Sequence, residues 1–306
     1  GGAAVVLGQD LTDDLIAPFS LDNAPVRGRA ARLGLVALDP ILRRHDYPRC
    51  VAMLLGEALA LATLVQSLLK ADGRLIVQAQ GAGLVSLLVA EVGDGGALRG
   101  YARLADGAAA ALAEAHRMAP ADLLGAGNLV ITLERGGDQP AYQGVVPIEG
   151  ATLAECAENF FRASEQTDTR IALAVGEVLG GPAPLWRGGG VLMQRVAGDI
   201  ARGDTSQDWS RASILFATAT DAELIDPDLP ADRLLYRLFH EEGVRMGDAS
   251  PLRDLCTCDE ERLTSVMRQF PPEEIRELVE PDGLLHARCQ FCSRRYFIAP
   301  EQVAGA

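Results

Sequence analysis

Apolar residues recur at helical spacing through the stretch that follows Asp46-Tyr47-Pro48. They fall three or four positions apart, which places their side chains on one face of a helix. A proline suits the first turn of a helix, because the backbone N–H that it lacks would have no partner there. We therefore expect a long helix at the centre of the first domain. Its apolar positions are Val51, Leu54, Leu55, Ala58, Leu61, Ala62, Val65, Leu68 and Leu69.

A second pattern, short apolar segments separated by glycine turns, follows this helix. The turns include Gly93 to Gly96 and Gly136-Gly137, and turns of this length join neighbouring antiparallel strands. Helical spacing returns from Thr152 to Ser164. The two patterns together predict an α+β fold, with helices packed on a largely antiparallel sheet. The strand candidates are residues 74–80, 84–92, 98–104, 129–134 and 142–147.

The stretch of glycine and proline at residues 182–190 predicts a domain boundary, and three short helices are expected beyond it. Asp208 suits the start of the first helix, Thr220 and Glu223 form a capping box, and Pro230 precedes the third helix. Short amphipathic helices cannot build a core of their own, so we expect them to dock on a neighbouring domain. The prediction is an α+β domain (1–190), a helical linker (191–250) and a small cysteine domain (251–306). The apolar linker residues are Ile214, Leu215, Phe216, Leu234, Leu235, Leu238 and Phe239.

Four of the six cysteines lie in two close pairs, Cys256 with Cys258 and Cys289 with Cys292. Two such pairs supply the four thiolates of a tetrahedral zinc site, so we expect one zinc per chain. Only one residue separates Cys256 from Cys258, and a pair this close can also form a strained disulfide that is easily reduced again. Between the pairs we expect a helix at residues 273–279 and a hairpin from Leu284 to Ile298. The pattern favours a redox-sensitive zinc domain.

Composition and charge narrow the class of protein. The chain has 306 residues, 48% hydrophobic and 23% charged, as is typical of a folded soluble protein. A net charge of −14 disfavours nucleic acid as a partner. The N-terminal residues lack the pattern of a signal peptide, and Glu57 and Gln66 interrupt the most apolar run, so we expect a cytoplasmic protein with no membrane partner. In that reducing compartment, paired cysteines indicate metal or redox chemistry.

The order of a sheet domain, a helical linker, Cys256-Thr-Cys258 and Cys289-Gln-Phe-Cys292 resembles a known family. This family is the 33-kilodalton heat shock protein, a redox-regulated holdase chaperone. The resemblance covers nearly the whole chain. Further motifs that match in order and spacing are His45 to Pro48, Tyr142 to Val146, Phe161 to Gln166, Thr169-Arg170 and Leu238 to Glu242.

The resemblance implies an ATP-independent chaperone that is inactive when it is reduced and zinc-bound. Oxidation would then form the disulfides Cys256–Cys258 and Cys289–Cys292, release zinc and expose a surface for unfolding proteins. It also implies that the oxidised form is a homodimer. We expect the seven apolar linker residues to be covered in the reduced form and to belong to the client-binding surface when exposed. No catalytic residue is expected in such a protein.

Several cysteine and histidine residues have alternative roles. A thiol–disulfide oxidoreductase using Cys289 and Cys292 is the alternative function, although no thioredoxin-like βαβ pattern surrounds this pair. Cys50 and Cys156 are expected to be buried packing residues. His286, near Cys289, is an alternative zinc ligand that a fourth thiolate makes unnecessary.

Overall fold

The computed structural model describes residues 12–69, 72–197 and 202–304. Residues 1–11 of the expected first domain, 198–201 of the expected linker and 305–306 of the expected last domain lie outside the described residues. The chain divides into two compact units, which meet in the sequence between Asp254 and Leu255.

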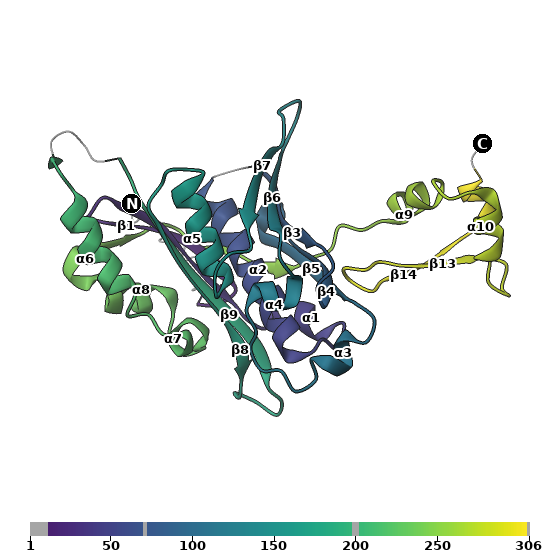
Figure 1. The fold of residues 1–306 in the computed structure, drawn as a ribbon, viewed down its shortest axis with the longest axis horizontal. Coiled ribbons are helices and arrows are strands. Elements are labelled where there is room, and N and C mark those ends of the chain that lie inside the picture. Colours follow the sequence, from purple (N-terminus) through teal and green to yellow (C-terminus); the bar gives the residue numbers. More distant parts are fainter. Residues whose placement is uncertain (1–11, 70–71, 198–201, 305–306) are drawn as a thin grey trace, which may run out of the picture. The chain divides into compact units, whose positions relative to one another are not determined.

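Two sheets form the framework of the first unit (Figure 1). All neighbouring strands in them are antiparallel except β12 (Arg253–Asp254) and β5 (Ala97–Leu104), so the prediction of a largely antiparallel arrangement is confirmed. The five predicted strands all belong to one of the two sheets, and the strands of the other sheet were not predicted. The first sheet has the order β10 (Val244–Met246), β1 (Leu15–Leu21), β2 (Val26–Leu33), β9 (Leu185–Arg195) and β8 (Thr169–Val178), with β11 (Ser250–Pro251) also paired to β1. The second has the order β12 (Arg253–Asp254), β5 (Ala97–Leu104), β4 (Val85–Val92), β3 (Gly73–Gln80), β6 (Asn128–Arg135) and β7 (Tyr142–Pro147).

Helix α2 (Arg49–Leu68) is the predicted long helix, and it packs on both sheets. It begins directly after Pro48, as the sequence indicates. Its length and apolar character would suffice to cross a membrane, but 83% of that apolar window is buried inside the protein. It is therefore a core helix of the first unit. The other described helices before strand β8 are α1 (Asp39–Arg43), η1 (Asp94–Gly96), α3 (Ala108–Ala111), α4 (Pro120–Leu124) and α5 (Leu153–Ala163).

The glycines at 188–190 lie in the middle of strand β9, so the expectation of a domain boundary at 182–190 is wrong for residues 185–190. Helices press on both faces of this strand. A Cβ on Gly190 would lie 2.8 Å from Leu64 of α2, and one on Gly189 would lie 2.0 Å from the carbonyl oxygen of Leu224. Glycine is required here for close packing, which in the sequence is hard to distinguish from a flexible turn.

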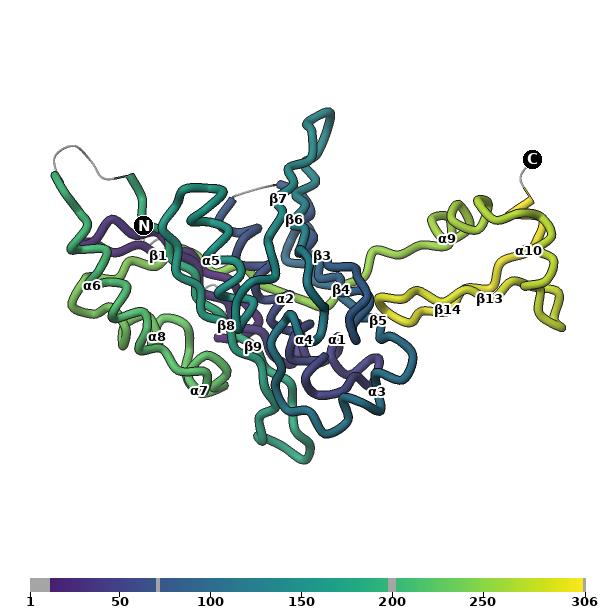
Figure 2. The backbone as a smooth tube through the Cα atoms, in the orientation of Figure 1, coloured from purple at the N-terminus to yellow at the C-terminus, as the bar shows by residue number. Residues whose placement is uncertain are grey.

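The three predicted linker helices belong to the first unit and cover the face of the first sheet that is turned away from α2. They are α6 (Ser206–Phe216), α7 (Asp221–Ile225) and α8 (Ala231–Phe239), followed by η3 (His240–Glu242), and their course can be followed in Figure 2. The predicted capping box between Thr220 and Glu223 is present at the start of α7. Their apolar side chains form one buried cluster with Leu15, Phe19 and Met193 of the sheet, so the expected docking is confirmed.

The second unit contains the predicted helix and hairpin. The helix is α10 (Pro272–Glu277), and the hairpin is β13 (Leu285–Arg288) with β14 (Arg295–Ile298). Helices α9 (Glu260–Met267) and α11 (Pro300–Val303) complete it. Among its described residues the buried apolar cluster consists of Ile275, Leu285, Ile298 and Val303. So small a core stabilises a fold weakly by itself.

Candidate metal centre

The four paired cysteines converge in the second unit. Cys256 and Cys258 lie before α9, and Cys289 and Cys292 lie in the connection between β13 and β14. Their four Sγ atoms all lie within 4.8 Å of one another, with 3.8 Å between Cys256 and Cys289 and 3.4 Å between Cys258 and Cys292. Four sulfurs around zinc at about 2.3 Å would lie about 3.8 Å apart, so the quartet has the size of a tetrahedral zinc site.

Backbone hydrogen bonds fix the connection that carries the second pair. The N–H of Cys289 donates to the carbonyl of Arg294 (2.9 Å), and the N–H of Ser293 donates to the carbonyl of Cys289 (2.8 Å). Ser293 adopts a left-handed conformation with φ of 65°, which turns the chain back into β14. The hairpin thereby holds the thiols of Cys289 and Cys292 within 4.8 Å of each other.

The thiols of the quartet ionise unequally. Burial opposes ionisation of Cys258, but the hydrogen bond from the Tyr296 hydroxyl, 3.1 Å from its Sγ, lowers the pKa of this thiol below its usual value. Burial raises the pKa of Cys292 to about 12, and the neighbouring Cys258 sulfur adds to the rise. Four sulfurs this close cannot all carry a negative charge without a cation, and a divalent metal ion supplies the charge that keeps all four deprotonated.

Tyr296 is a site residue that the sequence analysis missed. Its hydroxyl lies 3.1 Å from Sγ of Cys258 and 3.3 Å from the backbone oxygen of the same residue. The guanidinium of Arg294 lies 5.8 Å from the centre of its ring. In the sequence Tyr296 is indistinguishable from any aromatic residue of a strand, and only the pairing of β13 with β14 places it beside the first cysteine pair.

His286, the alternative ligand, bonds elsewhere. Its Nε2 lies 2.7 Å from a carboxylate oxygen of Asp282, and its ring packs edge-on against Phe297. The thiol quartet found among the described residues does not include it. The expectation that a fourth thiolate makes this histidine unnecessary agrees with the geometry.

Cys50 and Cys156 are buried in the first unit, in α2 and α5, with 2% and 0% of their surface exposed. Burial raises the pKa of both thiols, which makes them less reactive towards oxidants. The prediction that they are packing residues is confirmed.

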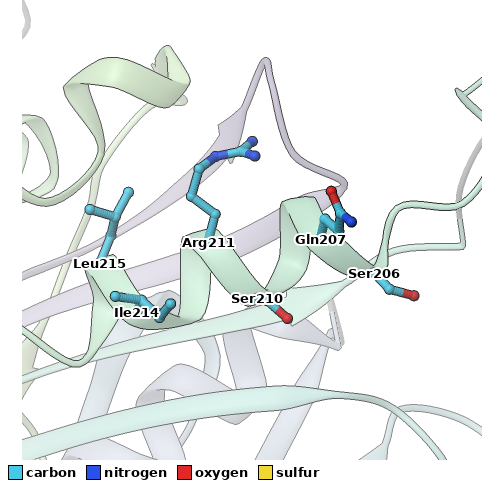
Figure 3. Close-up of a pocket in the computed structure, with 6 residues that line it drawn as sticks. All are labelled: Ser206, Gln207, Ser210, Arg211, Ile214 and Leu215. Atoms are coloured by element: carbon cyan, nitrogen blue, oxygen red, sulfur yellow. The ribbon is translucent and has the colours of Figure 1, made fainter.

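The apolar linker residues are mostly covered in this structure. Those that are buried or half-buried are Leu215, Phe216, Leu234, Leu235, Leu238 and Phe239. Ile214 differs, because 69% of its surface is exposed, so the expectation of full cover is wrong for this residue. It points away from the sheet on α6 and, with Leu215 and Arg211, lines an open surface hollow of about 480 Å³ (Figure 3).

Two largely antiparallel sheets around one core helix, helices docked on one sheet and a four-thiol unit define an α+β protein of two units with a candidate zinc site. The chain matches the Hsp33 protein family over residues 14–299. The chain belongs to this family, whose members are non-enzymatic holdases with a four-cysteine zinc site.

Individual relatives agree over nearly their full lengths. The chain is 51% identical to a 33 kDa chaperonin of Caulobacter vibrioides over 289 residues, which cover 94% of this chain and 95% of the relative. It is 36% identical to the 33 kDa chaperonin of Pseudomonas fluorescens, with 96% and 94% covered. The crystal structure of a 33 kDa chaperonin of Thermotoga maritima has the same fold, with a TM-score of 0.76 at 19% identity and 95% and 96% coverage.

Proposed function

We propose that this protein is an ATP-independent holdase that is inactive when it is reduced and zinc-bound and becomes active on oxidation. The observation that carries this proposal is the convergence of four thiols in a unit with a very small apolar core. A domain that depends on its metal for folding unfolds when its ligands are oxidised. Such a unit is suited to sense oxidants.

The three parts of the chain would have separate roles. Residues 1–190 would form the chaperone core, residues 191–250 the linker and residues 251–306 the redox switch. Strand β9 continues across the first of these limits, so the moving part of the linker would begin after Arg195. Strand β12 belongs to the first unit, so the switch itself would begin at Leu255. Helices α6, α7 and α8 are its described helical part.

Cys256, Cys258, Cys289 and Cys292 would hold one zinc, which stabilises the thiolates and cross-links the two loops. We propose that oxidation forms the disulfides Cys256–Cys258 and Cys289–Cys292. Each disulfide forms when two thiolates lose two electrons, and one hydrogen peroxide accepts these electrons and two protons to become two waters. In the folded quartet each sulfur also lies close to the other pair, so peptide mapping of the oxidised protein is the test of this pairing.

Release of the linker would expose apolar surface on both sides of the present contact. The sheet contributes Leu15, Phe19 and Met193, all buried beneath the helices. The proposed client-binding residues of the helices are Ile214, Leu215, Phe216, Leu234, Leu235, Leu238 and Phe239. Large exposed apolar patches bind other proteins, so unfolding clients would attach there, and a second oxidised copy would form a homodimer by the same surface. We place this activity in the bacterial cytoplasm, where thiols are normally reduced.

The test is the suppression of aggregation of a thermally unfolding client, measured before and after peroxide treatment and without nucleotide. We expect suppression only after oxidation, together with release of one zinc per chain. Equal suppression by the reduced and the oxidised protein would refute the switch. An insulin-reduction assay addresses the alternative, because a thiol–disulfide oxidoreductase using Cys289 and Cys292 would catalyse that reaction and a holdase would not.

A further inference from the structure

The end of helix α7 is held by two arginines of the first sheet. The last four carbonyls of a helix have no partner within it, and a helix of five residues is unstable by itself. Arg32 of β2 donates to three carbonyls of this end, at 3.0, 2.5 and 3.0 Å, and Arg187 of β9 donates to the fourth at 2.8 Å. The four carbonyls belong to Glu223, Leu224, Ile225 and Asp226.

Arg32 and Arg187, here called the arginine pair, are buried, with 2% and 6% of their surface exposed. They lie on the face of the sheet that carries the linker, because Ala30 and Val191, two and four residues away on the same strands, belong to the linker-facing cluster. Asp13 forms a two-pronged ion pair with Arg187, with 2.9 Å in one of its two contacts. Asp226 at the end of α7 also acts on Arg32, so in the docked form the two cations face two carboxylates, and Asp226 would leave with α7.

Burial and the charge of Arg187 lower the pKa of Arg32 to about 10, although the carboxylates of Asp13 and Asp226 partly oppose this shift. The side chain is still charged at neutral pH. A buried charged group is stable only when its hydrogen bonds are satisfied, and in this structure the described bonds of Arg32 all go to α7 and the residue after it. When α7 leaves, Arg32 loses these partners.

We propose that the arginine pair is a binding site for the carbonyl and carboxylate oxygens of client chains, which α7 occupies while the linker is docked. This inference rests on the proposed function and adds two polar residues to the proposed client-binding surface. An unfolding protein presents unpaired backbone carbonyls, and these match the oxygens that the pair holds in the docked form. A guanidinium group can donate hydrogen bonds to two such oxygens at once. Both arginines lie on central strands of the sheet, which hold their backbone in position.

The test compares full-length variants in two measurements. The first is amide hydrogen exchange of residues 221–226 in the reduced, zinc-loaded protein. The second is the Kd of the oxidised protein for fluorescently labelled, reduced and carboxymethylated α-lactalbumin, which stays unfolded. For Arg32→Met we expect faster exchange and a Kd raised about tenfold, the equivalent of one lost hydrogen bond to a charged group.

Gly189→Ala separates docking from client binding. Its methyl group pushes against the Leu224 carbonyl but leaves both arginines in place. We expect exchange of α7 to rise as in Arg32→Met, while the Kd of the oxidised protein stays within about twofold of wild type. If Arg32→Met also keeps the wild-type Kd, the arginine pair only holds the linker, and the inference is wrong.

Arg29→Met is the matched control, because Arg29 is a buried arginine of the same strand that donates to Ser67 of α2 on the opposite face. It should leave the client Kd unchanged, and an equal rise in Arg29→Met would contradict a specific site. Arg32→Lys, which retains the charge and the long stem, serves if Arg32→Met does not fold, and its Kd should rise less. Absence of client binding by oxidised wild type would instead refute the proposed function itself.

A second client preparation, in which the carboxyl groups are amidated, shows which client oxygens the arginine pair binds. If Arg32→Met still weakens binding of the amidated client, the pair holds backbone carbonyls. If the effect disappears, the pair holds carboxylates. Either result supports the site, whereas identical binding of both clients by wild type and Arg32→Met contradicts it.

Discussion

Gly189 of β9 lies so close to Leu224 of α7 that a Cβ on the glycine would be 2.0 Å from the Leu224 carbonyl oxygen. The contact joins the backbone of the sheet directly to the backbone of the linker. Neither group can move aside by rotation of a side chain, because both belong to the main chain. Helix α7 can therefore dock in this position only because residue 189 is a glycine and has no side chain.

Gly189→Ala should release α7 without oxidation. The added methyl group overpacks the contact, at a cost of about 1–3 kcal/mol to docking. We expect the reduced, zinc-loaded variant to suppress client aggregation partially, where wild type does not. Gly136→Ala is the control, because nothing lies within 4 Å of its Cβ position. If the reduced Gly189→Ala protein is as inactive as wild type, docking of α7 does not control the switch.

Phe239→Ala tests the apolar part of the same interface. Phe239 is fully buried and stacks on Phe19 of β1 with 6.0 Å between ring centres. Removal of such a ring costs about 3–5 kcal/mol, so the urea midpoint of the first unit should fall and client binding should appear in the reduced form. Ile214→Ala, at an exposed position of α6, should change stability by no more than about 0.5 kcal/mol.

Zinc affinity should depend on Tyr296 as well as on the thiols. Cys258→Ser removes a ligand and should abolish tight binding in competition with a chromogenic chelator. Tyr296→Phe removes the hydroxyl beside Cys258 and should weaken binding about tenfold, as is typical for loss of a hydrogen bond to a ligand. Tyr236→Phe, in α8 of the other unit, should bind zinc as wild type does. Unchanged affinity in Tyr296→Phe would show that this hydroxyl does not tune the site.

Stability of the first unit should fall between pH 4.5 and 8 because of Glu57. Burial raises the pKa of this carboxyl from 4.5 to about 7, and Arg117, 3.5 Å away, only partly opposes the rise. The folded state then holds the proton more tightly than the unfolded state. Its contribution is fully present below pH 4.5 and is lost as the pH rises through 7, by about 3 kcal/mol in all.

Glu57→Gln should remove this part of the pH dependence and stabilise the protein at pH 8. Urea unfolding at several pH values, followed by tryptophan fluorescence, provides the measurement, because Trp186 and Trp209 both lie in the first unit. Glu134→Gln, at an exposed site of β6, is the matched control. Parallel pH profiles of wild type and Glu57→Gln would exclude Glu57 as the cause.

The redox response should not require Cys50 or Cys156. Both thiols are buried and their pKa is raised, so peroxide should oxidise only the four thiols of the quartet. The double variant Cys50→Ala, Cys156→Ala should release zinc and gain client binding at the wild-type rate. Thiol counting before and after peroxide checks this expectation. A slower or incomplete response would assign one of these two residues a part in sensing.

The sequence by itself determined the elements whose signals are local. The spacing after Pro48 located α2, the capping box located α7, and the pattern from Leu284 to Ile298 located the hairpin of the second unit. The four thiols were identified by their spacing alone, because few residue types bind zinc and their separations are short. The resemblance to a chaperone family agreed with the comparisons over nearly the whole chain.

Only the tertiary structure decided which surfaces meet. Strand β2 has arginines at positions that an alternating pattern would give to apolar residues, and β9 has glycines that are typical of a turn. Both patterns arise because helices press on the two faces of the first sheet, and this packing involves residues about 190 positions apart. Arg32 and Tyr296 have roles for the same reason, since each acts on a group that folding brings to it from a distant part of the chain.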